Sequence, residues 1–391
     1  MRCAAVLVLL ATSASAREPD GAIAPAGRWT HTRGPASGSA RSHAPAIETL
    51  GEIAWIFQTK QPVRAPPLAW DGVGYLILGK SKSSTLAAID LTTGEQLAKA
   101  TLKDINPMRP AVWDQTVLLP VQGSKIVAYR LYGSKLRWRW TYDAGRGMSA
   151  PRVHAGEVYI TTPRALLRLR VGRRRAVWSR PGRFTGDVAV FGPHVYALER
   201  VKGKLALAVV ERLTGNVTER VEIGDDSGRP GGRVVVSEHV VGAAVPPDGD
   251  GGWHILERTT ERGAVHLAHK RAVKLASSPI AFDDRLFALT ALATWSLESP
   301  ARGVPVVLPR RRRDLFVAIT APVALSGTAV MGSWAANLRT REILWRLDEH
   351  TELWRASRKG LRFAIPVDKL LLMIPRDGLR IYAVKEELIG S

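Results

Sequence analysis

The stretch PLAWDGVGYLILGKSKSSTLAAIDLTTGEQL, from Pro67 to Leu97, decides the fold of this chain. A proline-led apolar triplet reaches an Asp-Gly turn, a second apolar run follows, and a third run ends in a Thr-Gly turn. Glycine and aspartate at such turns supply the positive φ values that tight hairpins need. The stretch therefore predicts a series of short antiparallel strands.

The same pattern recurs along the whole chain. Copies begin at positions 67, 110, 151, 187, 233, 279, 322 and 364, at an interval of about 42 residues. Clear copies read PAVWDQTVLLPV, PRVHAGEVYITT and PIAFDDRLFALT. A period of roughly 40–45 residues made of short strands is typical of a β-propeller blade. The sequence predicts an all-β fold, an eight-bladed β-propeller of four-stranded antiparallel blades.

The two ends of the repeat region complement each other. The last copy ends in LRIYAVKEEL (379–388), which leaves little chain for an outer strand. The stretch EIAWIF (52–57) precedes the first complete copy and resembles such a strand. We expect the two stretches to pair in one blade, because closing the ring removes the open edges of a linear array.

The N-terminal region has the composition of an export signal followed by a linker. Residues 1–16 combine a basic start, an apolar run and an Ala-Ser-Ala ending, which predicts a cleavable signal peptide and a periplasmic or secreted protein. The only cysteine, Cys3, lies inside that signal, so the lipid-anchor position has no cysteine. Residues 17–50 are rich in Pro, Gly, Ala and Ser, and we expect a flexible linker in which Trp29 alone could dock. The propeller is predicted over residues 51–385.

The chain is strongly basic, with a formal net charge of +21, and 42 of its 56 basic residues are arginine. A field of this size attracts anionic partners. In an exported protein those are acidic proteins, anionic lipids or envelope polysaccharides rather than nucleic acid. An arginine bias of the genome explains the same skew. We expect a monomer without a transmembrane segment.

Two local arginine clusters are candidates for a docking patch. They comprise Arg164, Arg168, Arg170, Arg173, Arg174 and Arg175 in blade 3, with Arg180 and Arg183 close by, and Arg310, Arg311, Arg312 and Arg313 between blades 6 and 7. Adjacent like charges repel each other unless a partner neutralises them. Solvated loop charge is the alternative, and the sequence does not place the two clusters on one face.

Three apparent motifs do not indicate chemistry. GYLILGKS (74–81) matches the phosphate-loop pattern, but a predicted strand fills it and no helix follows. Asp248 and Asp250 start like a calcium loop that no glutamate closes. His266 and His269 stand three residues apart, on opposite faces of a strand. The sequence predicts no catalytic, cofactor or metal site.

The repeat resembles a known family. The pattern of the copy from Pro67 to Leu97, followed by a strand tryptophan such as Trp138, Trp178 or Trp345, resembles the PQQ-like (quinoprotein-type) repeat over about 330 residues. WD40 propellers are the rival, because Trp70-Asp71 and Trp113-Asp114 are WD dipeptides. Both dipeptides sit in the first turn, however, and no Gly-His pair precedes them.

This resemblance implies two kinds of function. The quinoprotein alcohol dehydrogenases are longer, carry a disulfide of adjacent cysteines beside the quinone, and use an aspartate base with calcium-binding carboxylates. The other branch contains inert scaffolds, including the propeller lipoprotein of the outer-membrane β-barrel assembly machinery. The absence of cysteine after the signal favours a non-enzymatic scaffold that mediates protein–protein interaction in the bacterial cell envelope. The alternatives are a quinoprotein-like oxidoreductase and an envelope polysaccharide-binding propeller.

Overall fold

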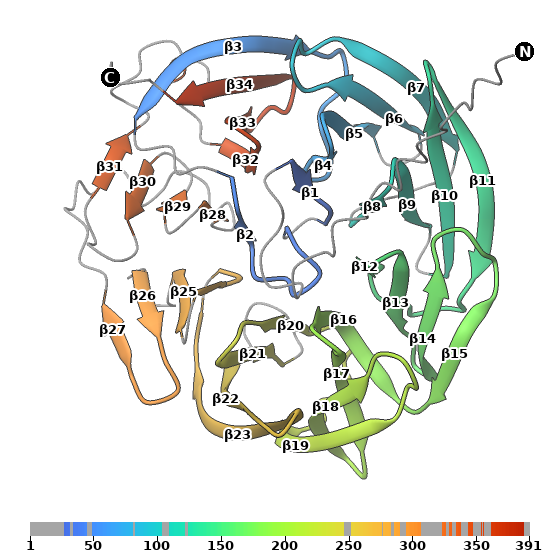
Figure 1. The fold of residues 1–391 in the computed structure, drawn as a ribbon, viewed down its shortest axis with the longest axis vertical. Coiled ribbons are helices and arrows are strands. Elements are labelled where there is room, and N and C mark those ends of the chain that lie inside the picture. The colour runs from blue at the N-terminus through green and yellow to red at the C-terminus, as the bar shows by residue number, and fades with distance from the viewer. Residues whose placement is uncertain are drawn as a thin grey trace, which may run out of the picture.

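Each copy of the sequence repeat forms one four-stranded antiparallel blade, and eight blades stand side by side in a closed ring (Figure 1). The predicted eight-bladed all-β fold is therefore confirmed. The structure is a computed structural model. It describes residues 27–31, 34–44, 49–80, 83–103, 109–121, 124–245, 252–275, 277–282, 285–289, 295–305, 323–325, 328–330, 334–337, 343–346, 353, 355 and 361–386.

In every blade the first strand lies nearest the axis and the last strand forms the rim (Figure 1). The first four blades comprise β4 (Leu68–Trp70), β5 (Val73–Lys80), β6 (Ser83–Asp90) and β7 (Gln96–Lys103); β8 (Ala111–Trp113), β9 (Thr116–Val121), β10 (Lys125–Tyr132) and β11 (Lys135–Asp143); β12 (Arg152–His154), β13 (Glu157–Thr161), β14 (Ala165–Arg170) and β15 (Ala176–Pro181); and β16 (Phe184–Phe191), β17 (His194–Val201), β18 (Lys204–Glu211) and β19 (Val217–Asp225).

The second half of the ring repeats this order. Blades 5 to 8 comprise β20 (Arg233–Val236), β21 (Val240–Ala244), β22 (Trp253–Glu261) and β23 (Ala264–Val273); β24 (Ile280–Phe282), β25 (Arg285–Leu289), β26 (Trp295–Glu298) and β27 (Gly303–Pro305); β28 (Val323–Leu325), β29 (Thr328–Val330), β30 (Trp334–Asn337) and β31 (Ile343–Arg346); and β32 (Leu361–Val367), β33 (Leu370–Pro375) and β34 (Arg380–Glu386) with β3 (Leu50–Gln58).

Blade 8 closes the ring with strands from both ends of the repeat region. β3 pairs with β34 in antiparallel register, with Ile56 opposite Tyr382 and Phe57 opposite Ile381. The predicted pairing of EIAWIF with LRIYAV is confirmed. The rim strand of blade 8 thus comes from the chain segment that immediately precedes blade 1, which removes the exposed edge that an open array would keep.

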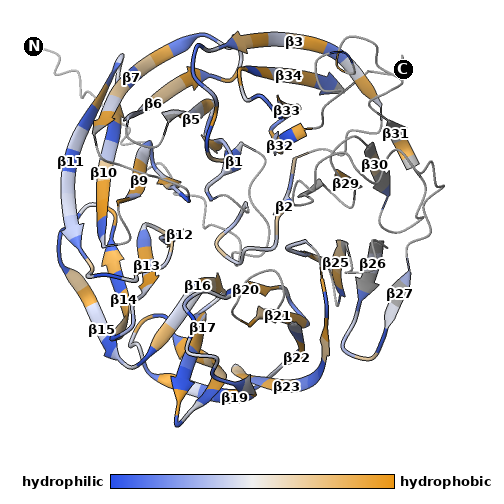
Figure 2. Ribbon diagram, turned by 180° about the vertical axis from the view of Figure 1, so that it is seen from behind, coloured by the Kyte–Doolittle hydropathy of each residue, from blue (hydrophilic) through white to orange (hydrophobic). Residues whose placement is uncertain are grey.

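The hydrophobic core lies between neighbouring blades. Leu86 of blade 1 and Val117 of blade 2 are fully buried and belong to one cluster, and further clusters join blades 2 and 3, 3 and 4, 4 and 5, and 5 and 6. Polarity rises toward the rim, where β11 is mostly polar while β10 inside it is mostly apolar (Figure 2). The apolar faces of the sheets therefore hold the ring together.

Rim tryptophans tie successive blades to each other. Each indole Nε1 donates a hydrogen bond to a backbone carbonyl of the next blade: Trp55 to Leu91 (2.8 Å), Trp140 to Val171 (2.8 Å) and Trp178 to Arg212 (3.0 Å). The acceptor always follows the third strand of its blade directly. In blade 2, Trp138 lies on the outer strand β11, as predicted, but Trp140 on the same strand makes the contact.

Glycines in the Thr-Gly turns make room for these indoles. A Cβ on Gly215 would lie 3.0 Å from the ring of Trp178, and one on Gly94 would lie 2.7 Å from the ring of Trp55. Both glycines also adopt positive φ, near 77°. The repeated Thr-Gly turn therefore serves both the hairpin and the contact between blades.

Part of the expected flexible linker fills the centre of the ring. Residues 27–31 and 34–44, here called the axial segment, include the short strands β1 (Arg28–Trp29) and β2 (Arg41–Ser42), which lie inside the circle of innermost strands (Figure 1). β1 pairs with β4 of blade 1, and β2 runs parallel to β28 of blade 7. Trp29 is fully buried, as is Ala40. The expectation of a flexible linker was wrong for these residues.

The axial segment contacts successive blades in the order of the sequence. It accepts one backbone N–H from the innermost strand of each blade between blades 2 and 6: Val112 to the Thr30 carbonyl, Val153 to the His31 ring, Val190 to the Ala36 carbonyl, Val236 to the Ser37 carbonyl and Ala281 to the Ser39 carbonyl. The inward edge of the innermost strands would otherwise leave buried N–H groups unpaired, at a considerable free-energy cost. Small side chains fit this narrow axis, which explains the linker-like composition.

Within the described part of the chain, no helix has the length and apolarity needed to cross a membrane. Residues 1–26, which contain the predicted signal peptide, lie outside the described residues.

Candidate functional site

The structure divides the predicted arginine cluster of blade 3 between the two ends of one strand. Arg164 precedes β14, whereas Arg173, Arg174 and Arg175 follow it. A strand of six residues spans about 20 Å, so these groups cannot meet one anion. The other predicted cluster, Arg310 to Arg313, lies outside the described residues.

Two of the predicted docking arginines pair with one glutamate. Arg168 is buried, donates from Nε to Glu157 Oε2 at 2.9 Å, and donates from Nη1 to the carbonyls of Arg212 and Leu213. Arg170 donates from Nε to the other oxygen of Glu157 at 3.1 Å. Arg168 therefore connects blade 3 to blade 4, and its guanidinium is already occupied.

An exposed group of arginines and aromatic rings lies on the rim of blades 2 and 3. We call it the rim patch, and it comprises Arg130, Tyr132, Trp138, Arg139 and Arg174. Trp138 exposes 53% of its surface and Tyr132 exposes 41%. The guanidinium of Arg174, in the last turn of blade 3, lies 5.9 Å from the Trp138 ring, and that of Arg139 lies 5.6 Å from the Tyr132 ring.

A β-bulge in β11 presents this patch. The register shifts between Ala128 and Tyr129, whose partners are Trp140 and Trp138, so Arg139 has no cross-strand partner. As a result Trp138 and Arg139 are both exposed, while Trp140 beside them is buried. Bulges commonly redirect side chains in this way. In the sequence, RWRW at 137–140 is the only indication of this arrangement. The strict alternation of a regular strand would place both tryptophans on the same face of the sheet.

The rim patch has a surplus of positive charge. Arg130 donates from Nη2 to Asp114 at 2.9 Å, an exposed ion pair. Among the described residues, neither Arg139 nor Arg174 has a carboxylate within ion-pair distance. Stacking on aromatic rings holds both guanidinium groups in place while leaving their N–H donors in solvent.

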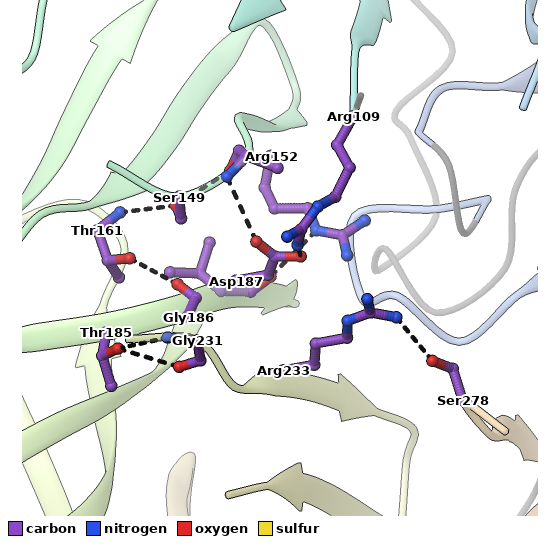
Figure 3. A network of polar contacts seen from close by, with 12 residues as sticks. Arg109, Ser149, Arg152, Thr161, Thr185, Gly186, Asp187, Gly231, Arg233 and Ser278 are labelled. Atoms are coloured by element: carbon purple, nitrogen blue, oxygen red, sulfur yellow. Dashed lines mark hydrogen bonds and ion pairs between the residues drawn. The ribbon is translucent and has the colours of Figure 1, made fainter. Parts of the chain in front are cut away.

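A second group of residues, polar and charged for the most part, forms a network where the innermost strands of neighbouring blades begin (Figure 3). Five residues occupy equivalent positions in blades 2 to 6, each three places before the N–H that binds the axial segment: Arg109, Ala150, Asp187, Arg233 and Ser278. These residues were not predictable from the sequence, because their equivalent positions become visible only when the innermost strands are aligned on their contacts with the axial segment.

Contacts between these positions link the blades around the axis. Asp187 accepts from Arg109 Nη1 and, at 3.3 Å, from the backbone N–H of Ala150. Arg233 donates from Nη1 to Ser278 Oγ at 2.8 Å. Asp187 also stands opposite Arg233 in the parallel pairing that joins the sheets of blades 4 and 5.

Arg152 lies within the same group and is almost fully buried. Its Nε donates to the carbonyl of Val188 at 3.1 Å. Burial lowers the pKa of Arg152 to about 10; Asp187 counteracts this, while Arg109 and Arg233 lower the pKa further. We call Arg109, Arg152, Asp187 and Arg233 the axial cluster. Its arginines outnumber its single carboxylate.

The described residues contain no group of three His, Cys, Asp or Glu side chains that could share a metal ion. His266 and His269 do not meet each other; His269 instead lies 2.9 Å, nitrogen to nitrogen, from His254 on the neighbouring strand. Asp248 and Asp250 lie outside the described residues.

A family comparison agrees with the repeat pattern. The model of a family described as outer membrane protein assembly factor BamB matches residues 36–218 and 82–351. No curated protein sequence matches the chain.

Solved structures with the same fold include members of both functional branches. BamB from Moraxella catarrhalis superposes with a TM-score of 0.56 at 13% identity, over 87% of this chain and 99% of its own. A quinohemoprotein alcohol dehydrogenase from Pseudomonas putida HK5 gives 0.57 at 12% identity, over 94% of this chain and 81% of its own. The computationally designed Ika8 protein gives 0.56 at 13% identity, over 86% and 100%. At such identities the superpositions establish the fold alone.

Proposed function

Because this chain belongs to the family of the outer membrane protein assembly factor BamB, we propose that it is a non-enzymatic scaffold that binds a partner protein in the bacterial cell envelope and supports the assembly of outer-membrane proteins. The export-signal pattern of residues 1–16 supports an envelope location. The rim patch is the observation that carries the proposal for protein binding.

The composition of the rim patch is that of a binding hot spot. Tryptophan, tyrosine and arginine dominate the energetics of protein interfaces, and they act best when a rigid scaffold holds them in position. Trp138 and Tyr132 project from the β10–β11 hairpin, whose strands are paired from end to end except at the bulge at Arg139. Arg174 reaches the same place from blade 3. Two blades therefore present one preformed surface.

The occupant that fits this surface is an acidic segment of a partner protein. Arg139 and Arg174 offer unpaired positive charge beside two exposed aromatic rings. The chain as a whole has 56 basic and 35 acidic residues, so its field attracts such a segment from a distance. Aromatic rings would cover the apolar stems of the bound residues.

The described residues offer less support for oxidoreductase chemistry. The axial segment fills the centre of the ring with hydrogen-bonded backbone, and Asp187, the carboxylate of the axial cluster, is already engaged by Arg109. The enzymatic branch of the family requires a set of free carboxylates. Neither the filled centre nor the ion-paired Asp187 provides such a set.

The test is genetic complementation in cells that naturally produce the chain. After deletion of its gene, we expect the amount of β-barrel proteins in the outer membrane to fall and the intact chain to restore it. The double variant Trp138→Ala/Arg174→Ser should fail to restore it, while Ile56→Ala, a control at an exposed apolar residue of β3, should succeed. Unchanged barrel levels after deletion would overturn the envelope-assembly function. Full rescue by the double variant would overturn the role of the rim patch.

A further inference from the structure

Three guanidinium groups and one carboxylate meet near the axis, where the innermost strands begin. Arg109, Arg152 and Arg233 come from blades 2, 3 and 5; Arg109 contacts Asp187 of blade 4, while Arg233 extends toward Ser278 of blade 6 (Figure 3). The axial cluster therefore has two positive charges in excess. Charges of one sign rarely gather in a protein interior without a partner of the opposite sign.

The charges of the cluster are incompletely neutralised. Asp187 binds Arg109 and the backbone N–H of Ala150, and within the described part of the chain it forms no ion pair with Arg152 or Arg233. Burial lowers the pKa of Arg152, and the positive charges of Arg109 and Arg233 lower it further. An anion bound here would oppose both effects.

N–H donors remain available for such an anion. A guanidinium carries five N–H groups. Arg233 uses Nη1 on Ser278, while its buried Nε has no hydrogen-bond partner. Arg109 uses Nη1 on Asp187, and 42% of its side-chain surface is exposed. Solvent therefore reaches the cluster at Arg109.

We propose that the axial cluster binds a small oxyanion that carries at least two charged oxygen atoms, such as phosphate or a short dicarboxylate. Two negative charges would neutralise the excess, and planar guanidinium groups bind such oxygens in bidentate geometry. Neutral alcohols and sugars lack the charge that this site selects.

The axial cluster and the rim patch are separate sites. Strands of a blade alternate in direction, so the turn that carries Arg174, between the third and fourth strands, lies at the opposite end from the start of the innermost strand. Anion binding at the axis therefore goes beyond the proposed scaffold function and does not depend on it.

Isothermal titration calorimetry of the full-length chain tests this site, with phosphate and succinate as separate probes at constant ionic strength. We expect saturable binding of at least one of them. Arg233→Gln and Arg109→Gln should each weaken it about tenfold or more, since each removes charged donors. Arg137→Gln removes the same charge from an exposed position of β11 outside the rim patch and should leave the binding unchanged. Binding of phosphate alone or of succinate alone would identify the ligand class.

A variant with the opposite effect on binding distinguishes loss of the site from misfolding. Asp187→Asn removes the competing carboxylate and frees Arg109, so this variant should bind the anion several times more tightly, which a damaged fold cannot mimic. Absence of binding by the intact chain at millimolar concentrations would overturn the proposal. Equal loss in Arg137→Gln and Arg233→Gln would also overturn it, because the effect would then reflect net charge alone.

Discussion

His31 accepts the backbone N–H of Val153 at its Nε2 atom, at 2.7 Å, although the two residues are 122 positions apart in the chain. The opposite ring nitrogen, Nδ1, lies 3.1 Å from the Gly34 carbonyl and 2.9 Å from Thr30 Oγ1. Accepting at Nε2 requires that nitrogen to carry no proton, so this contact fixes a neutral imidazole with its proton on Nδ1. The axial segment is thereby locked to blade 3.

Removal of residues 1–44 should destabilise the propeller strongly. The truncation removes the hydrogen-bond acceptors of the inward N–H groups in five innermost strands, and it removes Trp29 from the core. Each buried N–H left unpaired costs about 1–3 kcal/mol. Urea unfolding followed by tryptophan fluorescence checks this. A truncation of residues 1–26 is the control, and equal midpoints for the two truncations would contradict the structural role of the axial segment.

Stability should fall as the pH is lowered from about 6.5 toward 4. Burial holds the pKa of His31 well below its ordinary value, with Arg152 adding to the effect, and burial lowers the pKa of His154 to about 4. These histidines stay neutral in the folded state while the unfolded chain takes up protons below about pH 6.5. Their contribution is present above that pH and lost as the pH falls toward the folded-state pKa.

Substitution at His31 tests this pH dependence. His31→Gln removes one titrating group, so urea midpoints measured between pH 4.5 and 8 should vary less with pH than those of the intact chain. The residual slope reflects His154 and His254, the pKa of each of which burial lowers to about 4, together with His194, whose pKa burial also lowers. An unaltered slope in the variant would argue against a neutral, buried His31.

Two tryptophans on β11 should have opposite roles. Trp140→Phe removes the hydrogen bond to the Val171 carbonyl and should lower the free energy of unfolding by about 1–3 kcal/mol. Trp138→Phe, two positions earlier and exposed, should change stability by less than about 0.5 kcal/mol. Chemical unfolding of both variants provides the comparison. Equal losses would mean that the contact between blades 2 and 3 does not depend on Trp140.

Much of the ring was predictable from the sequence. The 42-residue spacing follows from the repeated blade, and the eight starting positions coincide with the eight innermost strands. The closing pair of β3 and β34 was predictable because each end lacked a partner strand. The first inference rests on turn residues and strand periodicity, and the second on the missing partner strand at each end of the repeat region.

The axial segment and the two candidate sites were not predictable in the same way. Small residues such as Ala36 and Ser37 read as a linker, since composition does not reveal that a narrow axis selects small side chains. The exposure of Trp138 depends on a bulge, which shifts the alternation of β11 without a turn residue to mark it. The axial cluster joins residues from four blades, whose proximity only the closed ring creates.

Reconstitution with quinone and calcium should yield no dye-coupled oxidation of alcohols or sugars. The described residues present no carboxylate set for calcium, and the single cysteine of the chain, Cys3, cannot form a disulfide within it. The purified chain is assayed beside a quinoprotein alcohol dehydrogenase as the positive control. Robust turnover would replace the scaffold function with an enzymatic one.

The most direct test of the scaffold function is photo-crosslinking from position 138 in cells that naturally produce the chain. A photoreactive amino acid there should attach to a protein of the outer-membrane assembly pathway, through a peptide rich in Asp and Glu. Arg139→Ser together with Arg174→Ser should abolish the crosslink, because both remove the charge that holds the acidic segment. The same label at exposed Ile56, on the rim of blade 8, should give no such product. A label at position 138 that yields no crosslink, or the same product from both positions, would contradict a docking site at the rim patch.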